Sequence, residues 1–375
     1  MKYSIEIGKI VEGAIKRDYT KVINYTQQLI DKLESDNEVR AASKFQKILS
    51  THNAATLSSI SGQSNFSIPV DSESRTLLAD IIYPEENNAT VVLSKNNTDE
   101  INEFVLSYKN ADKLNAMGIE MSNTLILYGP PGCGKTQCAF LIAKELHLPL
   151  VIARLDSLIS SYLGTTAKNI RSLFEFVQKM PCVLFLDEFD AIAKARDDSN
   201  ELGELKRVVN SLLQNVDSMS KDSLLVAATN HESLLDPAVW RRFDYKLRIT
   251  EPDYDAIIKM IDLFTHENSN LSQKDKEELA YVLLGLSGAD IEEILIKAIR
   301  SSVILEKTVS KKDYYEEVFW FKGILNLNDS EKNQLKSKAK YLRNCNEKTF
   351  SLQVIADILD SSKTTISKLV KEDEE

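Results

Sequence analysis

The residues with the clearest chemical potential form a glycine-rich loop between two apolar segments. Residues 124–128, TLILY, have the composition of a buried strand, and residues 137–146, QCAFLIAKEL, have a helical pattern. Glycines in such a loop let the backbone fold around a phosphate with its N–H groups pointing inward. We expect Lys135 to reach the outer phosphates and the hydroxyl of Thr136 to ligate Mg²⁺. The candidate nucleotide-binding residues are Gly129, Pro130, Pro131, Gly132, Cys133, Gly134, Lys135, Thr136 and Gln137.

Two adjacent carboxylates follow a second apolar segment, residues 182–186, CVLFL. A parallel strand ends at the sheet edge where phosphates bind, so Asp187 and Glu188 would lie beside them. We expect Asp187 to hold Mg²⁺ and Glu188 to polarise the attacking water. A solvated acidic turn is the alternative for such a cluster, but the apolar run directly before it disfavours that alternative.

The elements that position these groups follow a pattern typical of an α/β fold. Strand-like and helical segments alternate over residues 73–250, which predicts a parallel sheet covered by helices. The clearest strands are residues 124–128, 149–153, 182–186, 223–229 and 245–249. The predicted parts are a helical domain at 1–50, a linker at 51–72, a large α/β subdomain at 73–250, a small helical subdomain at 251–325 and a helical tail at 326–375.

Composition limits the function classes. The chain has 375 residues, of which 43% are hydrophobic and 27% charged, as in soluble globular proteins. No apolar run could cross a bilayer and the N-terminus lacks a secretory signal, so we expect a cytoplasmic protein without a membrane partner. The four cysteines lack CxxC spacing, which indicates reduced thiols without a disulfide frame or zinc. A net charge of −10 argues against nucleic-acid binding by the whole surface but leaves a local basic patch open.

Ordered motifs along the chain resemble those of the AAA ATPases, in the clade with a second region of homology. The motifs are GPPGCGKT, LFLDEFD, VAATN, LDPAVWRRFD and LSGAD, and the resemblance covers roughly residues 90–323. It implies a P-loop core with a small helical lid and Mg²⁺-dependent hydrolysis of ATP. It also implies a homo-oligomeric ring, which we expect to be a hexamer.

The resemblance assigns roles to residues outside the loop. It implies that Asn230 positions the attacking water, although a turn-forming role for an Asn at a strand end fits equally well. Arg241 and Arg242 match arginine fingers, which stabilise charge on the phosphoryl group in the neighbouring subunit. Because they are adjacent, their division of labour stays open. Gly288 and Ala289 match the position that packs near the nucleotide base, and they also suit the start of a helix.

A further motif indicates the substrate. Tyr162, Leu163 and Gly164 resemble the aromatic–hydrophobic–Gly loop with which related AAA translocases grip polypeptide in a central pore. A buried Tyr or an ordinary turn is the alternative. Residues 194–203 could form a second pore loop, but a solvated charged loop fits them at least as well. We expect a client protein as a partner. Because no HExxH motif is present, proteolysis would belong to a separate protease, and an adaptor would be a further partner.

The C-terminal tail supports a second hypothesis. Residues 350–369 resemble a helix-turn-helix, with Ala356 in the first helix and Asp360 where the turn usually has Gly. The residues expected to face outward on the second helix are Thr364, Thr365, Ser367 and Lys368. The candidates for phosphate contacts on the preceding helix are Lys332, Lys336, Lys338, Lys340 and Arg343. Residues 372–375 are acidic and would repel a duplex, so a protein-docking or packing unit is the alternative for the tail.

Two functions therefore follow from the sequence. The leading hypothesis is a ring-forming, ATP-driven motor that remodels or unfolds proteins. Its ring follows from the arginine fingers, because a finger acts only on nucleotide bound in the active site of a neighbouring subunit. The alternative is a DNA-associated regulator that the tail, residues 326–375, recruits to DNA.

Overall fold

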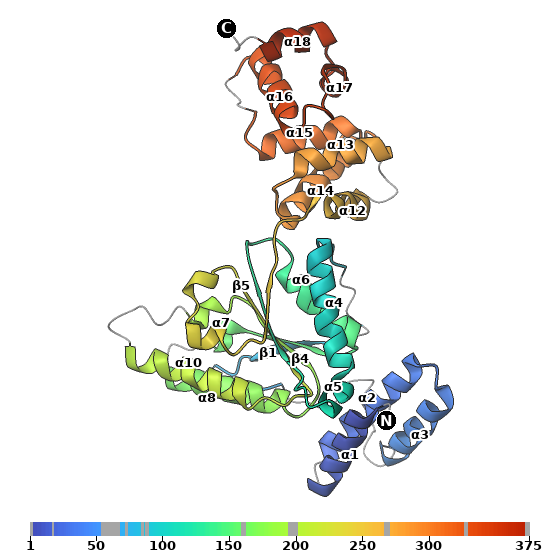
Figure 1. Ribbon diagram of the computed structural model, residues 1–375, viewed down its shortest axis with the longest axis vertical. Helices are drawn as coiled ribbons and strands as arrows, with labels where there is room; N and C mark the ends of the chain where they lie inside the picture. The colour runs from blue at the N-terminus through green and yellow to red at the C-terminus, as the bar shows by residue number, and fades with distance from the viewer. Residues whose placement is uncertain are drawn as a thin grey trace. The chain divides into compact units, whose positions relative to one another are not determined.

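The computed structural model describes residues 3–16, 19–53, 68–71, 74–83, 86, 90–158, 163–193, 202–265, 271–325 and 329–371 (Figure 1). The chain divides into two compact units. The sheet unit comprises Met1–Thr90, Asp99–Gly129 and Lys135–Arg248, and the helical unit comprises Val91–Thr98, Pro130–Gly134 and Ile249–Glu375. Most of the predicted linker lies outside the described residues.

The described strands of the sheet unit form one sheet in the order β1-β3-β4-β5-β2-β6. Their bounds are Ala79–Ile82 (β1), Thr124–Tyr128 (β2), Leu150–Ala153 (β3), Val183–Leu186 (β4), Leu224–Thr229 (β5) and Tyr245–Arg248 (β6). Only β1 is antiparallel to its neighbour, so the predicted parallel α/β sheet is confirmed. The sequence pattern does not predict β1, because this short edge strand buries only its first residue, Ala79.

The three strands nearest the phosphate loop are continuous apolar runs because both faces of the sheet are covered. Figure 1 shows α8 and α10 on one side of the sheet and α4 and α6 on the other. The helical elements before β6 are α1 (Ser4–Lys16), α2 (Tyr19–Ser35), α3 (Val39–Asn53), α4 (Lys95–Lys109), α5 (Ala111–Ala116), α6 (Lys135–Leu146), α7 (Leu155–Leu158), α8 (Leu163–Val177), α9 (Asp190–Ala193), α10 (Leu202–Asp217), η3 (Glu232–Leu234) and α11 (Pro237–Trp240).

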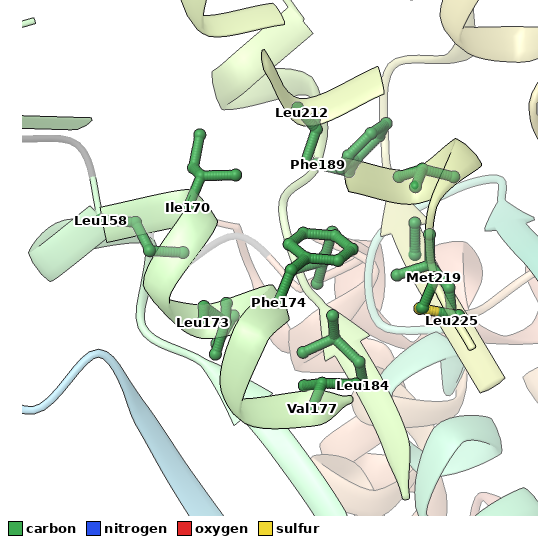
Figure 2. Packing of buried hydrophobic residues seen from close by; sticks show 14 of the residues in the cluster. Leu158, Ile170, Leu173, Phe174, Val177, Leu184, Phe189, Leu212, Met219 and Leu225 are labelled. Atoms are coloured by element: carbon green, nitrogen blue, oxygen red, sulfur yellow. The ribbon is translucent and has the colours of Figure 1, made fainter. Parts of the chain in front are cut away.

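The core of the sheet unit lies between α8, α10 and the sheet. Figure 2 shows Phe174 and Val177 of α8 beside Leu184 of β4, with Leu225 of β5 near Met219. Each of these side chains is buried. The packing holds the C-terminal ends of β4 and β5 at fixed positions, and two of the candidate catalytic residues, Glu188 and Asn230, lie just after those ends.

The helices α1 to α3 form a small bundle with its own apolar cluster around Leu29, Ile30 and Leu33, as their helical periodicity predicts. The bundle contacts the rest of the sheet unit at Asp222. Lys9 Nζ lies 2.8 Å from Asp222 Oδ2, and the buried Tyr25 donates to the same oxygen at 3.4 Å. Burial, followed by the nearby charge of Asp222, raises the pKa of Tyr25, so its hydroxyl stays a donor.

The helical unit contains α12 (Tyr254–Thr265), α13 (Gln273–Leu283), α14 (Gly288–Ile304), α15 (Lys311–Phe321), α16 (Glu331–Cys345), α17 (Leu352–Ile358) and α18 (Lys363–Lys371). Capping boxes define the starts of three of these helices, through Ser272, Ser287 and Ser310. One apolar core runs from Ile257 in α12 to Ile366 in α18, so the tail helices share their core with the lid helices. None of the described helices has the length and apolar character needed to span a bilayer.

Candidate nucleotide site

The start of α6 carries the buried cation of the site. Lys135 is the first residue of α6 and follows the loop after β2. Its Nζ donates to the carbonyl oxygen of Gly129 at 2.8 Å, which holds the ammonium group at the beginning of the loop. A buried charge is costly unless it is paired or hydrogen-bonded. The geometry therefore concentrates positive charge where the sequence predicts the outer phosphates of a nucleotide.

Thr136 and Asp187 lie next to each other, although they are far apart in the sequence. Thr136 Oγ1 donates to Asp187 Oδ2 at 2.8 Å, and the Glu188 N–H donates to Asp187 Oδ1 at 2.9 Å. Thr136 comes from the first turn of α6 and Asp187 directly follows β4. A hydroxyl beside a carboxylate provides the hard oxygen ligands that Mg²⁺ prefers, so these two residues fit the metal that the sequence predicts.

Glu188 adopts a backbone conformation that few non-glycine residues occupy. Its φ is +46°, in the left-handed region, and its side chain is exposed. The next residue, Phe189, fixes this turn because its N–H donates to the Ala228 carbonyl at 2.8 Å and its ring packs edge-on against Phe243. Neighbouring structure that enforces a sparsely populated conformation is typical of functional sites. The turn separates the carboxylate of Glu188 from that of Asp187 and directs it toward solvent.

Asn230 follows β5, the neighbour of β4 in the sheet. Its Oδ1 is buried and has no hydrogen-bond partner in the part of the chain that the structure describes. The preceding Thr229 is anchored differently: its hydroxyl donates to Asp190 at 2.7 Å and accepts from the His231 N–H. A buried acceptor without a partner needs an explanation, because most such groups are satisfied. An Asn that only formed a turn would not need a buried acceptor oxygen without a partner. The geometry therefore favours Asn230 as a hydrogen-bond acceptor for a group bound in the site.

The two candidate finger residues have different surroundings. Both follow α11, whose start is capped by Asp236 through the Ala238 N–H at 2.6 Å. Arg242 Nε lies 2.7 Å from Asp217 Oδ1 at the end of α10. Arg241 is exposed. Sequence reasoning does not find Asp217, since only the fold brings the end of α10 to this corner.

The middle of the loop, Pro130–Gly134, groups with the helical unit, where it packs against the start of α14. The Ala289 N–H donates to the Gly132 carbonyl at 3.0 Å. A Cβ on Gly132 would lie 2.7 Å from Ser287 Oγ, and a Cβ on Gly288 would lie 3.2 Å from Met260 Cε. Gly132 therefore lacks room for a side chain, and Gly288 would admit one only if Met260 shifted. The hydrogen bond joins Ala289 to the loop, and the packing of Gly288 and Ala289 near the nucleotide base stays a prediction.

The remaining predicted residues divide into described and undescribed ones. Gln137 is exposed in the first turn of α6, and Cys133 is buried with its Sγ 3.7 Å from the Pro131 carbonyl oxygen. Leu163 and Gly164 begin α8, but the structure does not describe the surroundings of their side chains. The predicted gripping residue Tyr162 lies outside the described residues, as does most of the candidate second pore loop, residues 194–201. Sequence reasoning misses the Thr229–Asp190 pair, for which the third carboxylate of LFLDEFD is the available signal.

Comparison with known proteins identifies the family. Residues 125–251 match the family described as "ATPase family associated with various cellular activities (AAA)". An AAA family ATPase from Sinorhizobium fredii, y4kL, is 40% identical over 289 residues, which are 77% of this chain and 86% of that protein. This chain belongs to the AAA family of ATPases. The predicted resemblance and the predicted ATP hydrolysis are thereby confirmed.

Other similar proteins match this AAA ATPase over shorter stretches. A proteasome-activating nucleotidase from Methanococcus maripaludis is 34% identical over 230 residues, 59% of this chain and 56% of that protein. An ATP-dependent zinc metalloprotease, FtsH 3 from Sphaerobacter thermophilus, is 32% identical over 205 residues, 53% of this chain and 42% of that protein. The match thus spans about half the length of these two relatives.

The fold of this AAA ATPase also matches a solved structure. The crystal structure of the FIGL-1 AAA domain has a TM-score of 0.56 with 22% identity, over 73% of this chain and 93% of that chain. The likeness confirms the predicted P-loop fold class.

Proposed function

We propose that this AAA ATPase works as a ring, expected to be a hexamer, and uses ATP hydrolysis to pull on client polypeptides. The observation that carries the proposal is the contrast at the end of α11. Arg242 is paired with Asp217 of its own chain, whereas the adjacent Arg241 is exposed. A guanidinium presented at the surface is suited to a neighbouring subunit's phosphates.

Within one protomer, the residues divide the work of hydrolysis. Lys135 binds the outer phosphates, and Thr136 and Asp187 would hold Mg²⁺. The chemistry that bound Mg²⁺ supplies is neutralisation of charge on the phosphate oxygens. Glu188 accepts a hydrogen bond from the attacking water, and Asn230 Oδ1, which is buried and lacks a partner among the described residues, orients that water.

The transition state gathers negative charge on the transferred phosphoryl group, and Arg241 of the next protomer would neutralise it. Arg242 then acts as a positioning residue, because its ion pair with Asp217 ties the end of α11 to the end of α10. A site that is incomplete without a neighbour makes hydrolysis depend on assembly.

The client is a polypeptide in this proposal, by similarity to a proteasome-activating nucleotidase and to an ATP-dependent protease. An adaptor or a separate protease would be a further partner. Tyr162, at the end of a segment outside the described residues and just before α8, would grip the chain. Casein, an unfolded probe, should stimulate ATP hydrolysis by the parent protein and by Tyr162→Phe but not by Tyr162→Ala.

Subunit mixing tests the ring. Glu188→Gln keeps the finger but loses the charge that activates water, and Arg241→Ala keeps Glu188 but lacks the finger. Each variant alone should hydrolyse ATP poorly. Mixed in equal amounts, they should regain activity at about a quarter of the sites, because a working site needs Glu188 from one protomer and Arg241 from its neighbour.

Arg242→Ala provides the matched control. When it is mixed with Arg241→Ala instead of Glu188→Gln, no activity should return, because the end of α11 is impaired in both chains and no site gains an intact finger. The ring proposal fails if the mixture of Glu188→Gln and Arg241→Ala is as inactive as either variant alone while both still bind ATP. It also fails if monomeric protein hydrolyses ATP at the parental rate without Arg241.

A further inference from the structure

The last three helices form a compact helix-turn-helix arrangement. Phe350, Ile355, Ala356 and Ile366 are buried in the apolar core that α16, α17 and α18 share with the lid helices. Two serines start the last two helices: Ser351 Oγ accepts from the Val354 N–H and Ser362 Oγ accepts from the Thr365 N–H. The buried face of α18 is therefore fixed, and the opposite face is presented outward.

The turn between α17 and α18 accommodates Asp360 in place of glycine. Asp360 has a φ of +49°, a conformation that Asp and Asn tolerate better than other non-glycine residues. The following Ser361 N–H closes the turn by donating to the Ala356 carbonyl at 3.0 Å. The Asp360 carboxylate forms an ion pair with Lys312 of α15, so its negative charge is compensated within the unit.

Some of the basic residues predicted to contact phosphate are used inside the unit. Lys338 Nζ is 2.5 Å from Glu316 and 5.4 Å from the centre of the Phe319 ring. Arg343 donates to the carbonyl oxygens of Glu347 and Phe350. These two side chains help to hold α16 in place, so their charges are committed within the unit.

The outward face of α18 is basic and polar. Its sequence, KTTISKLVK, contains three lysines and no acidic residue, in a chain whose net charge is −10. The exposed residues of α18 are Lys363, Thr364, Thr365, Lys368 and Lys371. Protein interfaces usually have apolar or aromatic anchors at their centre and few lysines, so this face fits a protein partner poorly.

We propose that α18 binds double-stranded DNA through this face, with the helix lying in the major groove. A helix of this length extends about 14 Å and is 10–12 Å wide with its side chains, which fits a groove about 12 Å wide. The lysines would contact phosphates. Thr364 and Thr365, whose hydroxyls each lie 2.8 Å from Ser362 Oγ, would offer base edges their methyl groups and their remaining hydrogen-bonding capacity. Phosphate contacts of this kind bind many sequences and weaken steeply with salt.

The test uses the full-length protein and a fluorescently labelled DNA duplex of mixed sequence, titrated by anisotropy at several salt concentrations. The variant Lys363→Gln/Lys368→Gln/Lys371→Gln should bind on the order of 100-fold more weakly at 0.1 M salt, with a logarithmic salt slope shallower by about 2.7. The matched control, Lys95→Gln/Lys113→Gln/Lys179→Gln, removes the same charge from exposed positions outside α16, α17 and α18 and should change little.

Both triple variants replace exposed side chains, so circular dichroism and ATP hydrolysis should match the parent protein and exclude misfolding. Three results would overturn the proposal: no duplex binding by the parent protein, an equal loss of binding in both triple variants, or tighter salt-dependent binding to polyglutamate than to DNA. The last result would assign α18 to an acidic protein partner.

Discussion

Replacing Gly132 with Ala tests how closely the phosphate loop packs against the start of α14. Gly132 has a φ of +73°, and a Cβ there would lie 2.7 Å from Ser287 Oγ and 3.2 Å from Ala289 Cβ. The first distance is too short for any real contact, so Ser287 Oγ must leave its hydrogen bonds with Asp290, or the loop or the start of α14 must move. The hydrogen bond from the Ala289 N–H to the Gly132 carbonyl would lengthen or break.

Gly285 provides an internal reference for the size of the effect. It has nearly the same φ, +77°, but nothing within 4 Å of its added Cβ. Placing Ala in a left-handed conformation costs about 1–2 kcal/mol at either position. Overpacking adds about 1–3 kcal/mol at Gly132 alone. The difference between the two variants isolates the steric contact from the backbone cost.

Two measurements separate these contributions. Titration with a fluorescent ATP analogue should show affinity lower by about 5- to 150-fold in Gly132→Ala, which corresponds to the overpacking energy, and nearly unchanged in Gly285→Ala. Hydrogen exchange of peptides covering the start of α14 should show lost protection of the Ala289 amide only in Gly132→Ala. If Gly132→Ala keeps parental ATP affinity and amide protection, the described packing between the loop and α14 is wrong.

Two further predictions concern ion pairs away from the nucleotide. Burial alone would raise the pKa of Asp313, but hydrogen bonds from Lys307 and Ser310 outweigh it and lower that pKa below its ordinary 3.8. Because the folded-state pKa is the lower one, this stabilisation is present above about pH 4 and lost as the pH falls further, so acid unfolding of Asp313→Asn should depend less steeply on pH below 4. Asp222→Ala should release the N-terminal bundle from Lys9 and Tyr25 contacts at a cost of about 1 kcal/mol, seen as faster hydrogen exchange in α2 but not in α13; equal exchange in both helices would contradict it.

The strongest predictions from sequence concern features that are local in the chain. The strand, loop and helix around Lys135 are contiguous, and the placement of Asp187 directly after β4 follows from one uninterrupted apolar run. The fold class could be predicted for the same reason, since buried parallel strands differ in pattern from amphipathic helices. The AAA motifs themselves are short and ordered, so they could be read without coordinates.

Other features depend on which distant segments the fold brings together. Whether Arg241 or Arg242 carries an ion pair depends on Asp217, which lies at the end of α10 and could not be paired with either from spacing. The polar role of Asn230 is favoured only because its buried Oδ1 lacks a partner among the described residues, and burial is a property of packing. The basic residues of α16 look equivalent in sequence, but Lys338 turns inward to Glu316.

By itself, the sequence determined the phosphate-binding loop, the pair of carboxylates after β4 and the membership of the AAA family, because these are encoded by residue types at fixed short spacings. Only the tertiary structure decided that Glu188 occupies a left-handed turn and that Gly132 has no room for a side chain. The reason is physical: backbone strain and steric exclusion arise from atoms that lie close in space but far apart along the chain.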